Sequence, residues 1–166
     1  MGYWNPRRLE NIFREREVIF ISHRGNLTGN NSEKENDPRY ILEAISKGYE
    51  CEIDVWSIKD RLYLGHDEPQ YEINLKFLQN NKLWCHAKNL TALEYMLLHN
   101  VHCFWHQEDD YTITSKGIMW TYPGKKLTKS SICVMPEKTN KEINLSGCLG
   151  VCSDTIVHFK EKFNEA

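Results

Sequence analysis

The chain alternates short apolar runs with polar segments, a pattern typical of strands separated by loops or helices. Eight runs predict strands: Val18–Ser22, Tyr49–Val55, Leu62–Gly65, Leu83–Ala87, His102–Trp105, Gly117–Thr121, Ser131–Met135 and Leu149–Cys152. Three segments between them carry apolar residues at helical spacing and predict helices over Pro38–Lys47, Gln70–Asn80 and Thr91–His99. The first half of the chain therefore alternates strands with helices, and the second half is mostly strands and short polar connections.

Strands that alternate with helices favour an α/β fold with a parallel sheet, and eight candidate strands favour its closure. We therefore expect a compact TIM-type (β/α)8 barrel. Such a barrel usually takes about 250 residues, whereas this chain has 166. The expected fold is a single barrel domain over residues 1–166, with an N-terminal extension at 1–17 and several second-half helices shortened or missing.

Composition narrows the class of protein. The net charge of −2 lacks the basic excess of a nucleic-acid binder, and no apolar run approaches the ~20 residues of a membrane-spanning helix. The charged segment Met1–Glu17 does not resemble a secretory signal. The six cysteines lie mostly inside apolar runs without C-x-x-C spacing, as reduced, buried thiols do. We expect a cytoplasmic protein.

Ionisable residues concentrate where the predicted strands end. Glu52 and Asp54 lie two apart on one strand, so their side chains point to the same face. The same strand-end positions hold His23, Arg24, His66, His86, Lys88 and His106. In a parallel barrel these ends converge on one mouth, where the active site of such folds lies. We therefore expect these side chains to meet.

The predicted mouth has the chemistry of a metal site beside an anion. Glu52, Asp54 and His86 offer ligands for a divalent cation, with Mg²⁺ or Ca²⁺ favoured by the oxygens and Mn²⁺ or Zn²⁺ admitted by the imidazole. Arg24 and Lys88 offer positive charge for an anionic group. A metal and two cations around one anionic centre suit phosphoryl-ester chemistry, in which charge builds on the phosphate oxygens.

Five ordered motifs carry a resemblance to a known family: His23-Arg24-Gly25, Glu35-Asn36, Glu52-Ile53-Asp54-Val55, Lys59-Asp60 and His66-Asp67. In order and spacing they resemble the N-terminal half of the glycerophosphodiester phosphodiesterase family. Trp120-Thr121 and Ser153-Asp154 extend the resemblance thinly to about residue 156. The resemblance implies a metal-dependent hydrolase of small-molecule phosphodiesters in lipid metabolism. It also implies that His23 and His66 are the general acid and base, that Glu52 and Asp54 bind the metal, and that Arg24 binds phosphate.

The chain departs from the family pattern at one metal ligand. The family has an E-x-K strand motif where this chain has His86-Ala87-Lys88, so Lys88 fits as a phosphate ligand and His86 replaces a carboxylate. A neutral imidazole removes one negative charge, which weakens Mg²⁺ or Ca²⁺ binding and makes transition metals more competitive. His106 and Trp120, also at strand ends, are predicted to contact substrate.

Several alternatives stay open at the level of the sequence. His86 can hydrogen-bond inside a barrel without touching a metal, Lys88 can be a solvated strand end, and packing or exposure explains His106 and Trp120 nearly as well. The altered ligand and trimmed second half also fit a barrel that binds a phosphorylated ligand or a partner without turnover. A third reading keeps the enzyme but gives a cyclic product. The alcohol moiety, the metal, the division of roles between the two histidines and the oligomeric state are left undetermined.

Overall fold

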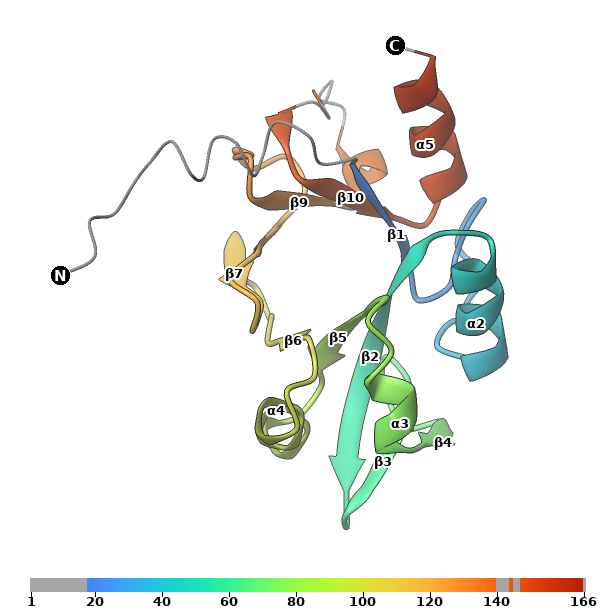
Figure 1. The fold of residues 1–166 in the computed structure, drawn as a ribbon, viewed down its shortest axis with the longest axis vertical. Helices are drawn as coiled ribbons and strands as arrows, with labels where there is room; N and C mark the ends of the chain where they lie inside the picture. Colours follow the sequence, from blue (N-terminus) through green and yellow to red (C-terminus); the bar gives the residue numbers. More distant parts are fainter. Residues whose placement is uncertain (1–17, 140–143, 145–146, 166) are drawn as a thin grey trace, which may run out of the picture.

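The computed structural model describes residues 18–139, 144 and 147–165, and its ten strands form one mixed sheet that curves into a half-barrel (Figure 1). The sheet order is β4-β3-β2-β1-β10-β9-β8-β7, with β5 pairing with β2 and with β6. The strands are β1 (Ile19–His23), β2 (Glu50–Ile58), β3 (Arg61–Leu64), β4 (Tyr71–Ile73), β5 (Leu83–Ala87), β6 (Cys103–Phe104), β7 (Tyr111–Ile113), β8 (Met119–Thr121), β9 (Ser131–Val134) and β10 (Gly150–Ser153). The helices are α2 (Pro38–Ser46), α3 (Leu75–Leu78), α4 (Leu90–Leu98), α5 (Ile156–Asn164) and a 3₁₀ turn, η1 (Pro136–Lys138).

The predicted TIM-type (β/α)8 barrel is wrong. The pairings of β3 with β2, of β4 with β3 and of β7 with β8 are antiparallel, and the described residues contain four short α-helices. Nine residues, 122–130, join the parallel strands β8 and β9. A helical crossover takes a dozen or more residues, so this connection cannot carry a helix across the sheet. The fold is strand-rich.

Every predicted strand overlaps an observed one, whereas the helices were predicted less well. The segment predicted as one helix over Gln70–Asn80 divides into β4 and α3, because Asn74 caps the helix by accepting a hydrogen bond from Phe77 N at 3.0 Å. Strands β4 and β7 and helix α5 were not predicted. The charged segment 1–17 lies outside the described residues. No described helix has the length and apolar character needed to cross a membrane.

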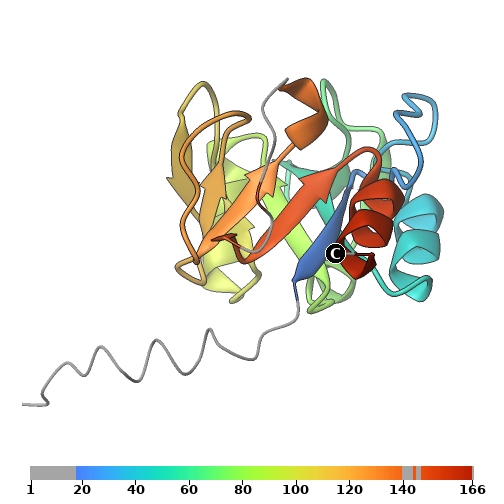
Figure 2. The same cartoon turned by 90° about the horizontal axis from the view of Figure 1, so that it is seen from above.

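Apolar side chains pack on both faces of the curved sheet, and the longer helices cover its outer face (Figure 2). On β2, the buried side chains of Cys51, Ile53 and Val55 belong to the cluster that packs under α2, α3 and α4. Since strand side chains alternate between faces, Glu52 and Asp54 point to the inner face. A second cluster fills that inner side: Ile21, Trp84, Phe104, Trp120, Ile132, Leu149 and Cys152. It forms an apolar floor below the polar residues at the strand ends.

Gly65, which precedes His66, has no room for a side chain. Its φ is +150°, and a Cβ there would collide with the backbone oxygen of Glu68. We expect Gly65→Ala to destabilise the fold by about 3 kcal/mol, because it adds a backbone clash to the strain of the positive φ. Gly29→Ala is the matched control, since Gly29 has the same φ and nothing within 4 Å of its Cβ position. Urea unfolding that gave equal losses for both variants would contradict this account of Gly65.

Buried His102 predicts a loss of stability in acid. Its ring packs 4.3 Å from that of Trp84, and burial, aided by Lys116, lowers the pKa of His102 from 6.5 to about 4. Between those pH values the unfolded chain binds a proton that the folded chain does not, so stability falls as the pH drops through that window. We expect this residue to account for about 2 kcal/mol of lost stability between pH 7 and pH 5.

The phenylalanine variant isolates this effect. His102→Phe keeps an aromatic ring beside Trp84 but cannot titrate, so its free energy of unfolding should fall less between pH 7 and pH 5 than that of the wild type. Other titrating groups contribute equally to both proteins and cancel in the comparison. Identical pH dependence in urea titrations of the two proteins would show that His102 is not the cause.

Candidate active site

Strand pairing brings the predicted site residues together at one end of the inner face. In the parallel pair β1–β2, His23 lies opposite Glu52. In the parallel pair β2–β5, Asp54 lies opposite His86. Opposite residues on neighbouring strands share a face, so four of the expected side chains become neighbours through the sheet alone.

His66 reaches the same place by a route that the sequence did not predict. Strand β3 is antiparallel to β2, with Leu64 opposite Val55, and the following Gly65 N donates to Asp54 O at 3.2 Å. The hairpin therefore returns along β2 and leaves His66 Nδ1 3.3 Å from Asp54 Oδ2. The His66 side chain is 42% exposed, so it is open to a ligand that approaches from solvent.

Glu52, Asp54 and His86 form a compact group that can hold a metal ion, with one ligand atom from each lying within 4.8 Å of the others. Oε2 of Glu52 and Oδ1 of Asp54 are buried without a hydrogen-bond partner among the described residues. Buried carboxylate oxygens are stable only when they are paired or bind a cation. Burial, followed by the charge of Asp54, raises the pKa of Glu52, because both disfavour its charged form. These residues fit a divalent cation.

Asp54 is the electrostatic centre of the group. Its Oδ2 accepts a hydrogen bond from Asn36 Nδ2 at 3.0 Å and lies 2.9 Å from Arg24 Nε. Lys88 Nζ lies 3.5 Å from the other oxygen, Oδ1. Burial raises the pKa of Asp54, but the contacts with His66, His86 and Arg24 outweigh it and hold the pKa well below its usual range. These contacts therefore favour the ionised form of Asp54 despite its full burial.

His23 is paired with a carboxylate from the far end of the chain. Its Nδ1 lies 2.7 Å from Asp154 Oδ1, which also accepts from Asn26 Nδ2 at 2.8 Å. Its Nε2 faces Glu52 Oε2 at 3.8 Å. Burial lowers the pKa of His23, but the hydrogen bond to Asp154 and the charge of Glu52 outweigh it and raise the pKa. An imidazole anchored through one nitrogen and turned toward a buried carboxylate with the other suits proton transfer.

Arg24 and the Glu35-Asn36 motif form the supporting layer. Arg24 has a left-handed backbone, with φ of 54°, and its Nη1 donates to Glu35 Oε2 at 3.1 Å. Glu35 Oε1 accepts from Asn26 Nδ2 at 2.8 Å. His23, Glu35 and Asp154 are also close enough to share a metal, but the carboxylates of this second group already accept hydrogen bonds from Arg24, Asn26 and His23. This layer therefore holds the side chains of His23 and Arg24 in position and does not form a second candidate metal site.

The other predicted substrate residues differ in their positions. Lys88 Nζ lies 3.4 Å from His66 Nδ1, inside the group. The ring of His106 lies at its edge, 6.1 Å from that of His86. Trp120 is 5% exposed and packs against Phe104, whose ring in turn stacks on His86. The structure therefore places Trp120 in the apolar floor, one ring away from the candidate ligands.

Sequence reasoning missed three residues of the site. Asp154 was noticed only as the tail of a motif, and Asn26 and Asn36 were not assigned roles as hydrogen-bond donors. Asp154 directly follows β10, so the strand-end rule that selected the other residues could have selected it. Asn26 and Asn36 lie in the loop after β1. Asn36 belongs to the Glu35-Asn36 motif, whereas Asn26 has no comparable signal in the sequence.

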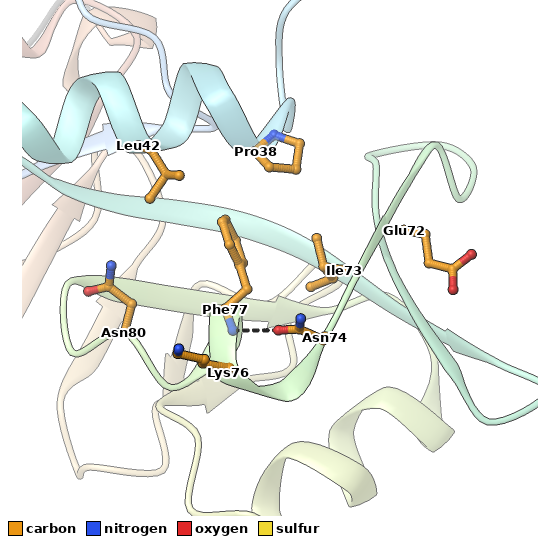
Figure 3. A pocket seen from close by; sticks show the side chains of 8 residues that line it. All are labelled: Pro38, Leu42, Glu72, Ile73, Asn74, Lys76, Phe77 and Asn80. Atoms are coloured by element: carbon orange, nitrogen blue, oxygen red, sulfur yellow. Dashed lines mark hydrogen bonds between the residues drawn. The ribbon is translucent and has the colours of Figure 1, made fainter.

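A pocket lies elsewhere on the described part of the molecule. It has a volume of about 450 Å³ on the outer face between α2 and α3, with Leu42, Ile73 and Phe77 among its lining residues (Figure 3). It shares no residue with the group around Asp54. Comparisons with known protein families, with curated proteins and with solved structures each found no match. A function must therefore be argued from the site itself.

Proposed function

We propose that the protein is a metal-dependent phosphodiesterase that hydrolyses a glycerophosphodiester-like substrate to an alcohol and a phosphomonoester. The observation that carries the proposal is the meeting of two carboxylates, three imidazoles and two cationic side chains at one end of the sheet: Glu52, Asp54, His23, His66, His86, Arg24 and Lys88. The order of the motifs, which resembles that of the glycerophosphodiester phosphodiesterases, supports the same reaction class.

Charge in the site is arranged for an anionic ester. A divalent cation held by Glu52, Asp54 and His86 supplies Lewis-acid polarisation of a phosphate oxygen when it is bound. Lys88 binds the phosphate by charge and can turn from Asp54 toward the ligand. Arg24 is fixed by Asp54 through Nε and by Glu35 through Nη1, which leaves its Nη2 on the His66 side for a phosphate oxygen.

Two histidines move the protons, His23 at the end of β1 and His66 in the loop after β3. His23 exchanges a proton at Nε2, because Asp154 accepts from Nδ1 and fixes the orientation of the ring. His66 is held beside Asp54 and Lys88 and is the more exposed of the two. One of them takes a proton from the attacking water, and the other gives a proton to the departing alcohol oxygen.

A screen for turnover tests the proposal. Purified protein is incubated with a panel of phosphodiesters and, in turn, with Mg²⁺, Ca²⁺, Mn²⁺, Co²⁺ and Zn²⁺, and the products are followed by phosphorus NMR. We expect metal-dependent release of a phosphomonoester. A cyclic product would show that the reaction is an intramolecular phosphoryl transfer and not a hydrolysis. Binding of the esters with no turnover under any metal would refute the enzyme and favour the non-catalytic alternative.

A further inference from the structure

The orientation of the His86 ring is fixed from two sides. Its Nε2 lies 3.0 Å from the backbone oxygen of His106, and its ring stacks on Phe104 with an interplanar angle of 3°. A backbone carbonyl can only accept a hydrogen bond, so Nε2 carries a proton. The other ring nitrogen, Nδ1, is therefore the one available for binding, and it points at the two carboxylates.

Nδ1 of His86 occupies a position that requires a positive charge beside it. It lies 3.1 Å from Asp54 Oδ1 and 3.9 Å from Glu52 Oε1. A bare nitrogen lone pair and two carboxylate oxygens repel one another, and either a proton on Nδ1 or a metal ion between the three atoms relieves that repulsion. A metal ion that binds here displaces the proton. A ligating imidazole whose second nitrogen donates to a backbone carbonyl is the usual arrangement in metal sites.

The charge around this group disfavours hard cations. The two carboxylates carry a formal charge of −2, but Arg24 and Lys88 lie 2.9 Å and 3.5 Å from Asp54 and offset it. Mg²⁺ and Ca²⁺ bind mainly through charge and prefer oxygen ligands, so they gain little here. Co²⁺ and Zn²⁺ gain from a nitrogen ligand as well, and they stand higher in the general order of affinities.

We propose that His86 makes this a site for borderline transition-metal dications, such as Co²⁺ and Zn²⁺, in preference to Mg²⁺ and Ca²⁺. The inference rests on the metal site of the proposed function and adds the class of ion that the site selects. Selectivity comes from Nδ1 of one side chain, so a single substitution should weaken it.

Equilibrium binding to the metal-free full-length protein tests the selectivity. After treatment with chelator, Co²⁺ and Mg²⁺ are titrated in separate experiments by calorimetry, and the visible spectrum of Co²⁺ reports its ligands. We expect wild-type protein to bind Co²⁺ at least about 100-fold more tightly than Mg²⁺. His86→Glu should lower this ratio at least about tenfold, chiefly through tighter Mg²⁺ binding. His99→Gln, which alters the histidine directly after the outer helix α4, should leave the ratio unchanged.

The outcomes separate this inference from the proposed function. Equal affinities for Co²⁺ and Mg²⁺ in the wild type, or an unchanged ratio in His86→Glu, would overturn the selectivity even if Mg²⁺ supported hydrolysis of phosphodiesters. Selective Co²⁺ binding with no turnover would uphold the selectivity and refute the enzyme. If His86→Glu does not fold, His86→Gln removes the imidazole with little change in volume and must lower Co²⁺ affinity.

Discussion

His23→Ala is expected to lower the rate of phosphodiester hydrolysis by about 10²–10⁴-fold, the usual contribution of one general acid or base. The side chain is 13% exposed, is anchored to Asp154 through Nδ1 and presents Nε2 to Glu52. Its loss removes the proton-transfer group but none of the three candidate metal ligands. The measurement is kcat at saturating metal, on whichever diester the screen identifies, with circular dichroism as the check on folding.

A histidine outside the site provides the control for His23. His99 follows α4, where its Nδ1 donates to the backbone oxygen of Tyr95 at 2.8 Å and its ring stacks on that of Tyr95. His99→Ala should therefore keep the wild-type rate. Unchanged turnover in a folded His23→Ala variant would remove His23 from the catalytic machinery and, with it, the proposed pair of histidines.

Glu52→Gln is expected to abolish metal-dependent hydrolysis, with a loss of about a thousandfold or more, without destabilising the metal-free protein. Glu52 is a buried carboxylate whose Oε2 has no hydrogen-bond partner among the described residues, and burial, which makes ionisation costly, raises its pKa. Since the neutral amide removes that cost, we expect stability to be unchanged or about 1 kcal/mol higher. Urea unfolding in the presence of chelator measures the stability. The rise in melting temperature that added Co²⁺ is expected to produce in the wild type should be absent in Glu52→Gln.

Asp54→Asn is the matched comparison, because the same chemical change occurs two residues along the same strand. Asp54 is paired with Arg24 at 2.9 Å and accepts a hydrogen bond from Asn36 at 3.0 Å. Neutralising it leaves buried positive charge uncompensated, and we expect a loss of about 3 kcal/mol in the metal-free protein. Equal destabilisation by the two variants would mean that Glu52 is a structural carboxylate rather than one kept for a ligand.

Local features of the sequence predicted local structure well. Alternation of apolar and polar residues located the strands, and the spacing of Glu52 and Asp54 predicted that both point away from Ile53 into the inner face. Apolar runs carry no information on strand direction, and so the direction of β3 was missed and with it the reason why His66 meets Asp54. The prediction of the fold class was wrong for the same reason, because a count of strands cannot distinguish hairpins from helical crossovers.

Long-range contacts of the site were beyond what spacing can predict. The hydrogen bond between His23 and Asp154 joins residues 131 apart and depends on the pairing of β1 with β10. No single segment of the sequence determines which strands pair. The tautomer of His86 likewise depends on a backbone carbonyl 20 residues away, and a carbonyl has no signature in a sequence.

The position of β1 between β2 and β10 has a consequence for biosynthesis. A nascent chain emerging from the ribosome makes β1 and β2 early, but His23 has no carboxylate anchor until residues 150–154 have been made and have joined the sheet. The contact between His23 and Asp154 would thus form only after the other nine strands of the described sheet have been made. In a circular permutant opened in the 122–130 connection, β10 would be synthesised before β1. The pairing of the two strands could then form as soon as β1 had been made.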